Sequence, residues 1–334
     1  MASFVNRLSD ASILIVDTGR KGEIRQCEAL ANACDLPWRF IKNDGIPSDE
    51  PTLILSFGRA LKQAWCLKAV FGGRPLIIQL GRPRLKAPSM LDLILLMPQD
   101  DYPESPQTFH LNMPLNGASI SRSSIPVDTT QGPLSVLLGG PTRHFGFSDT
   151  DALVLLSRAE RLAAVIGTEL RVVPGPRTSD QVMKILKERY RQTPERIDKR
   201  PLSTVLKESG RLVVTADSAS LIADAWRTGK PTWLYPLPVR LPPVQRLKIM
   251  ADRITPELRH TLIRRGWLAG GTDFTRWHQA LVQQGLVRPL TERGLKEPDW
   301  RMSCPAPDEE LRACRDRVLA LVAGRQPATD RVER

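Results

Sequence analysis

The chain has 334 residues, of which 41% are hydrophobic, and a formal net charge of +12. This length and composition favour two globular domains. No apolar run reaches the roughly 18 to 20 residues of a membrane span, and the N-terminus MASFVNRLSD lacks the apolar core of a signal peptide. Five scattered cysteines without a C-x-x-C pair indicate neither a disulfide framework nor a zinc site. We therefore expect a cytoplasmic protein.

The positive charge is concentrated in the second half of the chain. Residues 1–150 hold 15 Lys and Arg against 14 Asp and Glu, whereas residues 151–334 hold 33 against 22. A basic surface attracts nucleotide diphosphates, nucleic acids and acidic lipid surfaces, or merely keeps the protein soluble. Phe, Trp and Tyr make up only 5% of the chain, and no basic run is interleaved with aromatic residues. We therefore expect no nucleic-acid partner.

The first part of the chain alternates strand-like and helix-like segments. SILIVD (12–17) predicts a buried strand, and after Gly19 and Gly22 the spacing of apolar residues predicts a helix. The following strands lack polar alternation, which is typical of a parallel sheet covered by helices on both faces. Asp100 and Asp101 are expected in a solvated loop. The further strands are predicted at 38–42, 52–57, 75–80 and 91–97, with a helix at 58–71.

A connector rich in Ser, Thr, Gly and Pro follows at 116–133, and then the pattern restarts. Strands are predicted at 133–140, 168–174, 211–216 and 231–236, and helices at 151–167, 179–192 and 218–229. This organisation predicts two α/β Rossmann-like domains facing each other across a cleft. The predicted boundaries are 1–125 for the N-terminal domain, 133–305 for the C-terminal domain, 306–325 for a C-terminal helix and 326–334 for a flexible tail.

Ligands of open α/β sheets bind beyond the carboxyl ends of the strands, so the loops there are the candidate sites. After the strand RLVVT, Ser218 and Ser220 lie at the start of a helix, whose N-terminus favours a phosphate. Asp224, one turn further, is placed to accept a hydrogen bond from a ribose hydroxyl. Ser and Asp are also common helix caps, which is an equally good explanation of this loop taken alone.

Two neighbouring loops add to this set, one after the predicted strand 133–140 and one after the predicted strand 168–174. Glycines that end a strand let the backbone approach a ligand, or form a simple turn, and arginine binds diphosphate oxygens through its planar fork. Three adjacent strands that each end in such residues favour an anionic nucleotide ligand. The candidate donor-binding residues are Gly140, Thr142, Arg143, Thr178, Ser179, Thr215, Ser218, Ser220 and Asp224, with Arg177 as a catalytic candidate.

The loop DTGRKGEIRQ in the first domain matches neither G-x-G-x-x-G nor a P-loop. Glu23, at the start of the helix, is a candidate general base for an acceptor hydroxyl. The more ordinary explanation is that acidic residues favour the first helical turn. The candidate acceptor-side residues are Asp17, Gly19, Gly22 and Gln26.

Other motifs restrict the chemistry further. The chain contains no H-E-x-x-H, no G-x-S-x-G and no paired Cys/His set, so we expect no metal site. The segment ITPELRHTLIRRGWL (254–268) is basic and amphipathic. Such a helix can touch an anionic membrane, but packing against its own domain is the more common outcome, and we favour packing.

Three motifs together resemble the mitochondrial-fission-factor-like family, whose bacterial members are regarded as glycosyltransferases. They are LLGGPTRHF (137–145), the PRTS that follows a strand (176–179), and VVTADSASLIADAWRTGKP (213–231). DTGRKGEIRQCEALA and DFTRWHQALVQQGLVRPL are similar to further segments of that family. This chain has Glu23 where bacterial relatives often have His, and Asp224 where they have Glu.

The resemblance implies a glycosyltransferase-B-like (GT-B-like) fold with the nucleotide on the second domain and the acceptor on the first. We expect a metal-independent glycosyltransferase without a cofactor, which transfers a sugar from a nucleotide-sugar donor to a glycan or lipid-linked acceptor. Peripheral contact with the inner face of the membrane fits such an acceptor. The alternatives are a non-catalytic scaffold of the same fold and a nucleotide-sugar epimerase.

Overall fold

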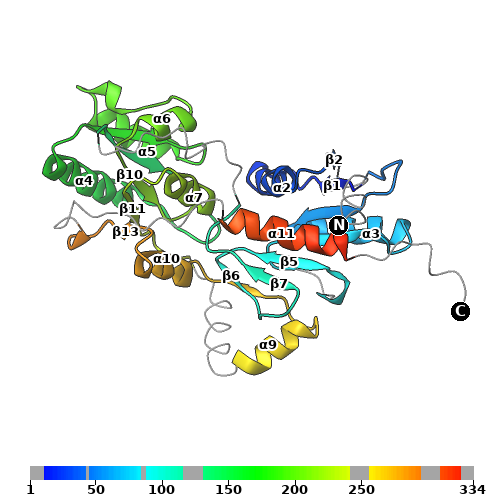
Figure 1. The fold of residues 1–334 in the computed structure, drawn as a ribbon. Coiled ribbons are helices and arrows are strands. Elements are labelled where there is room, and N and C mark those ends of the chain that lie inside the picture. Colours follow the sequence, from blue (N-terminus) through cyan, green and yellow to red (C-terminus); the bar gives the residue numbers. More distant parts are fainter. Residues whose placement is uncertain are drawn as a thin grey trace, which may run out of the picture. The chain divides into compact units, whose positions relative to one another are not determined.

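The computed structural model describes residues 11–42, 45–83, 88–115, 131–240, 256–294 and 309–324 (Figure 1). The chain forms two compact units. Unit 1 comprises Met1–Gly117, Asp252–Phe274 and Ala306–Arg334, and unit 2 comprises Ala118–Ala251 and Thr275–Pro305. This division differs from the predicted boundaries, because Asp252–Phe274 and the C-terminal helix both belong to unit 1. The predicted tail at 326–334 lies outside the described residues.

Unit 1 contains a six-stranded parallel sheet in the order β2-β1-β3-β4-β5-β7. The strands predicted from apolar runs are all present, and the central ones are fully buried, as expected for a sheet with helices on both faces. The strands are β1 (Ile13–Val16), β2 (Trp38–Ile41), β3 (Leu53–Phe57), β4 (Leu76–Leu80), β5 (Leu93–Leu96) and β7 (Thr108–His110), with helices α2 (Lys21–Cys34) and α3 (Leu61–Val70).

Helix α11 (Glu309–Ala323) completes the core of unit 1. Cys314, Val318 and Val322 are buried in the cluster that also contains Leu30 of α2, and Figure 1 shows α11 beside α2. The carboxylate of Glu310 accepts hydrogen bonds from the backbone and side-chain nitrogens of Asn112. The predicted C-terminal helix is therefore part of a hydrophobic core.

The prediction that Asp100 and Asp101 lie in a solvated loop is wrong. They form the short strand β6 (Asp100–Asp101), which pairs antiparallel with β12 (Gly271–Thr272). Asp100 is only 5% exposed, and its carboxylate accepts hydrogen bonds from the backbone N–H groups of Arg82 and Met97. Asp100 is buried and Asp101 is partly buried because a segment distant in sequence returns to pair with them.

Unit 2 contains a five-stranded parallel sheet in the order β13-β11-β10-β8-β9. Helix α6 was not predicted, because it is short and its sequence has little apolar periodicity. The strands are β8 (Leu134–Leu138), β9 (Leu170–Pro174), β10 (Arg211–Thr215), β11 (Thr232–Tyr235) and β13 (Arg288–Pro289), and the helices are α4 (Asp149–Ile166), α5 (Asp180–Arg189), α6 (Leu202–Glu208), α7 (Ala219–Arg227) and α10 (Phe274–Gln283).

The Gly-Lys-Pro motif at 229–231 has a clear structural role. Gly229 adopts a left-handed conformation after α7, with φ of 71°. Lys230 is buried, and its ammonium donates hydrogen bonds to the carbonyls of Leu206 and Lys207 at the end of α6, both at 2.7 Å. These are carbonyls that a helix C-terminus leaves without intrahelical partners. The motif therefore fixes α6 to the start of β11.

Candidate functional site

The sheet of unit 2 has a topological switch point between β8 and β10. From β8 the chain continues on one side to β9, and the later strands β10 and β11 extend the sheet on the other side. The loops after β8 and β10 therefore separate at the carboxyl edge, where open α/β sheets bind ligands.

A cavity of about 350 Å³ opens at this edge of unit 2. Its volume is in the range of small-molecule sites. Four of the candidate residues, Arg177, Ser218, Ser220 and Asp224, line it together. The cavity is lined by Leu137, Leu138, Gly139, Val173, Pro174, Gly175, Pro176, Arg177, Arg200, Leu202, Ser218, Ser220, Leu221 and Asp224.

The N-terminus of α7 forms one wall of the cavity. Ser218 is the N-cap residue, and its hydroxyl accepts a hydrogen bond from the backbone N–H of Leu221 at 3.4 Å. A helix N-terminus carries about half a positive charge, so it favours an anionic group. Ser220 and Asp224 are four residues apart and share one face of the helix. This wall thus combines a positive helix end, hydroxyl groups and a carboxylate.

Asp217 holds the three loops of the site together. Its side chain is fully buried, and its carboxylate accepts a hydrogen bond from the Thr215 hydroxyl at 2.6 Å. The other carboxylate oxygen accepts from the backbone N–H of Gly140 at 3.2 Å and from the guanidinium of Arg177 at 2.8 Å. One buried aspartate therefore connects the loops that follow β8, β9 and β10, and orients Arg177.

The glycines of these loops are required by close packing. A Cβ at Gly139 would collide with the carboxylate of Asp217, and a Cβ at Gly140 would collide with the backbone carbonyl of Arg177. A Cβ at Gly175 would likewise collide with the carbonyl of Leu138. The structure therefore gives Gly140 a packing role, and its N–H is already bonded to Asp217.

Several candidate donor-binding residues lie outside the lining of the cavity and stabilise the loops instead. The Thr215 hydroxyl accepts from the backbone N–H of Gly139 at 2.8 Å, and the Thr178 hydroxyl donates to the Gly139 carbonyl at 2.9 Å. Ser179 caps α5, and Thr142 accepts from the N–H of Phe145 in its own turn. Arg143 is exposed and does not line the cavity.

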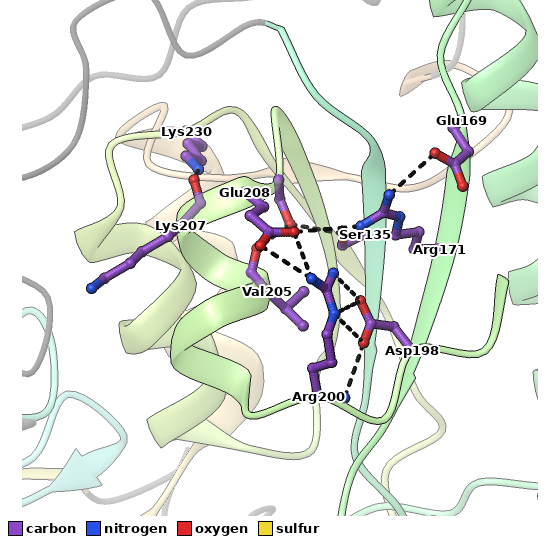
Figure 2. Close-up of polar contacts among 10 residues, drawn as sticks. Ser135, Glu169, Arg171, Asp198, Arg200, Val205, Lys207, Glu208 and Lys230 are labelled. Carbon is purple, nitrogen blue, oxygen red and sulfur yellow. Dashed lines mark hydrogen bonds and ion pairs between the residues drawn. The ribbon is translucent and has the colours of Figure 1, made fainter. Parts of the chain in front are cut away.

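Arg200 lines the cavity but was not predicted from the sequence, because it lies in the connection before α6 rather than in a loop after a strand. Figure 2 shows its guanidinium between the carboxylates of Asp198 and Glu208, at 2.7 and 2.9 Å. The hydrogen bonds from Arg200 hold the pKa of the Asp198 carboxyl below its usual value. The same bonds to Asp198 raise the pKa of Arg200. Arg200 is thus held in place at the wall of the cavity, with its charge balanced by two carboxylates.

In unit 1, the candidate acceptor-side residues lie on the loop after β1 and the start of α2. The Asp17 carboxylate accepts from the N–H of Gly19 at 2.7 Å, and Gly19 has φ of 71°. Gln26 is buried, and its side chain bonds the N–H of Leu115 and the carbonyl of Gly22. These contacts give Gln26 a structural role and leave Asp17 and Gly19 at the sheet edge.

Glu23 lies at the switch point of the unit 1 sheet. Its carboxylate is 3.2 Å from the guanidinium of Arg20, in a largely exposed ion pair. It is also close to Gly58, which follows β3, since a Cβ there would be 4.0 Å from a carboxylate oxygen of Glu23. Because β1 and β3 are neighbours in the sheet, Glu23 lies between the loops where a ligand of unit 1 would bind.

Two further features concern metals and membranes. In the described ranges, no group of three or more His, Cys, Asp or Glu residues is arranged to hold a metal ion. Across the same ranges, no helix has the length and apolarity needed to cross a membrane.

Comparison with solved structures identifies the fold. The UDP-GlcNAc 2-epimerase from Methanocaldococcus jannaschii aligns with a TM-score of 0.53 and 9% identity, over 94% of this chain and 99% of that chain. The Streptomyces sp. SF2575 glycosyltransferase SsfS6 aligns with a TM-score of 0.41 and 12% identity, over 93% and 99%. The predicted class, two Rossmann-like α/β units of the GT-B type, is confirmed.

Comparison of sequences identifies the family. No curated protein matches this chain. A sequence profile described as mitochondrial fission ELM1 matches residues 21–255, which is most of the chain and includes the VVTADSASLIADAWRTGKP motif. The protein therefore belongs to the mitochondrial fission ELM1 family.

Proposed function

We propose that the protein is a glycosyltransferase that moves a sugar from a nucleotide-sugar donor to a glycan or lipid-linked acceptor. One observation carries this proposal: Arg177, Ser218 and Asp224 line a single cavity at the carboxyl edge of the unit 2 sheet. A guanidinium, a helix N-terminus and a carboxylate suit a diphosphate and a ribose.

In the proposed reaction, an oxygen of the acceptor forms a bond to the anomeric carbon of the sugar. The bond from that carbon to the diphosphate breaks, and the nucleotide diphosphate leaves with the electron pair. The negative charge that develops on the diphosphate is stabilised by Arg177 and by the N-terminus of α7. Asp217 positions Arg177 for this role through the 2.8 Å hydrogen bond. Fixed donors of this kind stabilise a transition state strongly, because they need no reorganisation during the reaction.

The other roles are part of the same proposal. The hydroxyls of Ser218 and Ser220 donate to phosphate oxygens, and Asp224 accepts from a ribose hydroxyl. Glu23 accepts the proton of the acceptor hydroxyl, and Asp17 and Gly19 contact the acceptor. The charge of the leaving group is carried by protein groups in this scheme, so no metal ion is required. A cytoplasmic location, with the acceptor at the inner face of the membrane, agrees with this chemistry.

The test is a transfer assay with radiolabelled nucleotide-sugars of several bases and with lipid-linked and glycan acceptors. Arg177→Ala should lower kcat about 10²- to 10³-fold, since it removes one positioned donor. The matched control is Arg191→Ala, because Arg191 is exposed and lies outside the cavity lining. Transfer by Arg177→Ala at the wild-type rate would contradict the proposal. An altered sugar formed without an acceptor would indicate an epimerase instead, and the absence of any nucleotide binding would indicate a scaffold.

A further inference from the structure

Helix α9 (Pro256–Arg264) of unit 1 has one face packed against its own unit. Ile263 is 1% exposed and lies in the core cluster that contains Leu14 and Leu61. Arg259 is also buried, and its guanidinium forms an ion pair of 2.7 Å with Asp101. These contacts fix the orientation of the helix. The predicted packing on its own domain holds for Ile263 but not for Leu258 and Trp267, which were expected on the same packed face.

The other side of α9 presents apolar side chains to solvent. Leu258 is 58% exposed and Trp267 is 66% exposed. The helix ends in a Schellman motif, in which Gly266 has φ of 70° and donates to the carbonyl of Ile263, and the N–H of Trp267 donates to the carbonyl of Leu262. This turn holds Trp267 beside the last helical turn.

The exposed Leu258 and Trp267, with the half-buried Leu262 between them, form an apolar strip, which we call the α9 strip. Leu258 and Leu262 are one turn apart on the same face of the helix. In a Schellman motif, the residue after the left-handed glycine typically packs against the residue whose carbonyl it bonds, and here these residues are Trp267 and Leu262. The N–H groups of Gly266 and Trp267 each donate a backbone hydrogen bond of 2.9 Å. These bonds fix the backbone of the turn and thereby place Trp267 in the strip.

The charge beside the α9 strip is positive. Arg264 and Arg265 are both exposed, and the Arg265 guanidinium lies 5.8 Å from the centre of the Trp267 ring. Residues 256–268 contain three arginines and one glutamate, and one of these arginines, Arg259, is buried and paired with Asp101. Trp beside Arg is typical of helices that lie in the interface of an anionic membrane, where the ring enters the headgroup region and the guanidinium contacts phosphate.

We propose that the α9 strip docks unit 1 on an anionic lipid surface. Leu258 and Trp267 enter the boundary between headgroups and acyl chains, and Arg264 and Arg265 bind lipid phosphates. A second copy of the chain is a poorer occupant, because a stable dimer buries about 800 Å² on each partner, far more than two large side chains provide. This proposal concerns unit 1 alone and does not depend on the transferase activity.

The experiment is co-sedimentation of the full chain with vesicles of phosphatidylglycerol and phosphatidylcholine, and with vesicles of phosphatidylcholine alone. The wild-type protein should sediment with the anionic vesicles, and salt should weaken this binding. Leu258→Gln with Trp267→Gln should lower the partition coefficient about tenfold or more. Arg264→Gln with Arg265→Gln should lower it about fivefold for each arginine.

The matched control is Val70→Gln on α3, which replaces another exposed apolar residue of unit 1 and should leave the partition coefficient unchanged. Thermal unfolding of each variant checks that the fold is retained. Three results would overturn the proposal: wild-type protein that stays in the supernatant, equal binding to both kinds of vesicle, or equal partition of the α9 strip variant and the Val70 variant. Loss of self-association on Trp267→Gln, seen by sedimentation velocity, would assign the strip to a second copy instead.

Discussion

Both units contain a buried aspartate that binds backbone N–H groups at the strand ends, but the two aspartates lie at different places in the sheets. In unit 2, Asp217 joins the loops after β8, β9 and β10, at the switch point itself. In unit 1, Asp100 joins the loops after β4 and β5, away from the switch point between β1 and β3. Although the two sheets have corresponding strand orders, the buried aspartate therefore braces the switch point in unit 2 and a different part of the sheet edge in unit 1.

At the unit 1 switch point, the carboxylates of Asp17 and Glu23 bond neighbours in their own loop. Asp17 bonds Gly19 two residues away, and Glu23 pairs with Arg20 three residues away, in a largely exposed ion pair. Exposed pairs of this kind contribute little to stability. The comparison indicates a preorganised edge in unit 2 and a more adaptable edge in unit 1, which are the sites proposed above for the nucleotide and the acceptor.

The largest effect on stability should follow from Asp217→Ala. The N–H of Gly140 and the hydroxyl of Thr215 would lose their buried acceptor, at about 1 to 3 kcal/mol each, so we expect a loss of about 4 kcal/mol. Denaturant unfolding followed by circular dichroism measures it. Asp180→Ala is the control, since Asp180 is exposed in the first turn of α5 and should cost less than about 1 kcal/mol. Equal losses for the two variants would show that Asp217 does not organise the edge.

A buried lysine gives unit 2 a pH dependence. Burial lowers the pKa of Lys230 from 10.5 to about 8, whereas Lys68 of unit 1 pairs with the carboxylate of Asp92. Between about pH 8 and 10.5, the unfolded chain holds the proton of Lys230 more tightly than the folded chain does. The free energy of unfolding of the wild type, relative to Lys230→Met, should therefore rise with pH across this window, by at most about 3 kcal/mol. A difference that is constant or falls from pH 7.5 to 10.5 would contradict this prediction.

Two glycines test the difference in packing between the edges. Gly140→Ala should cost about 3 kcal/mol, since the new methyl group meets the backbone of Arg177. Gly19→Ala in unit 1 meets no atom within 4 Å and should cost about 1 kcal/mol, from its left-handed backbone alone. Thermal unfolding of both variants measures the difference. If Gly19→Ala were the more destabilising change, unit 1 would have the tighter edge.

Much of the fold could be predicted because its strands are continuous apolar runs between helical segments. For the site, the carboxyl ends of parallel strands share one edge, which is why Arg177, Ser218 and Asp224 could be expected together from separate motifs. Long-range packing could not be predicted. The return of Asp252–Phe274 to unit 1 buries Asp100, although the local sequence around Asp100 is polar.

The role of Asp217 was missed for a related reason. Next to Ser218 at the start of a helix, an aspartate has the pattern of a cap, and sequence alone does not reveal bonds to loops 40 and 77 residues away. The signal that could have revealed this role is Thr-x-Asp at the end of a buried strand, in a domain whose first strand is followed by two glycines. Arg200 had no comparable signal, because its partners Asp198 and Glu208 lie in an irregular connection and a short helix.

The most direct test of the central claim, that the unit 2 cavity binds a nucleotide diphosphate, is titration calorimetry with UDP, GDP, CDP and dTDP. Wild-type protein should bind one of these nucleotides, and Arg177→Ala should raise its Kd about tenfold or more, because a charge-assisted hydrogen bond is lost. Arg20→Ala, on the exposed edge of unit 1, should leave the Kd unchanged. Binding of none of the four nucleotides, or an equal loss of affinity in both variants, would contradict the assignment of the site to unit 2.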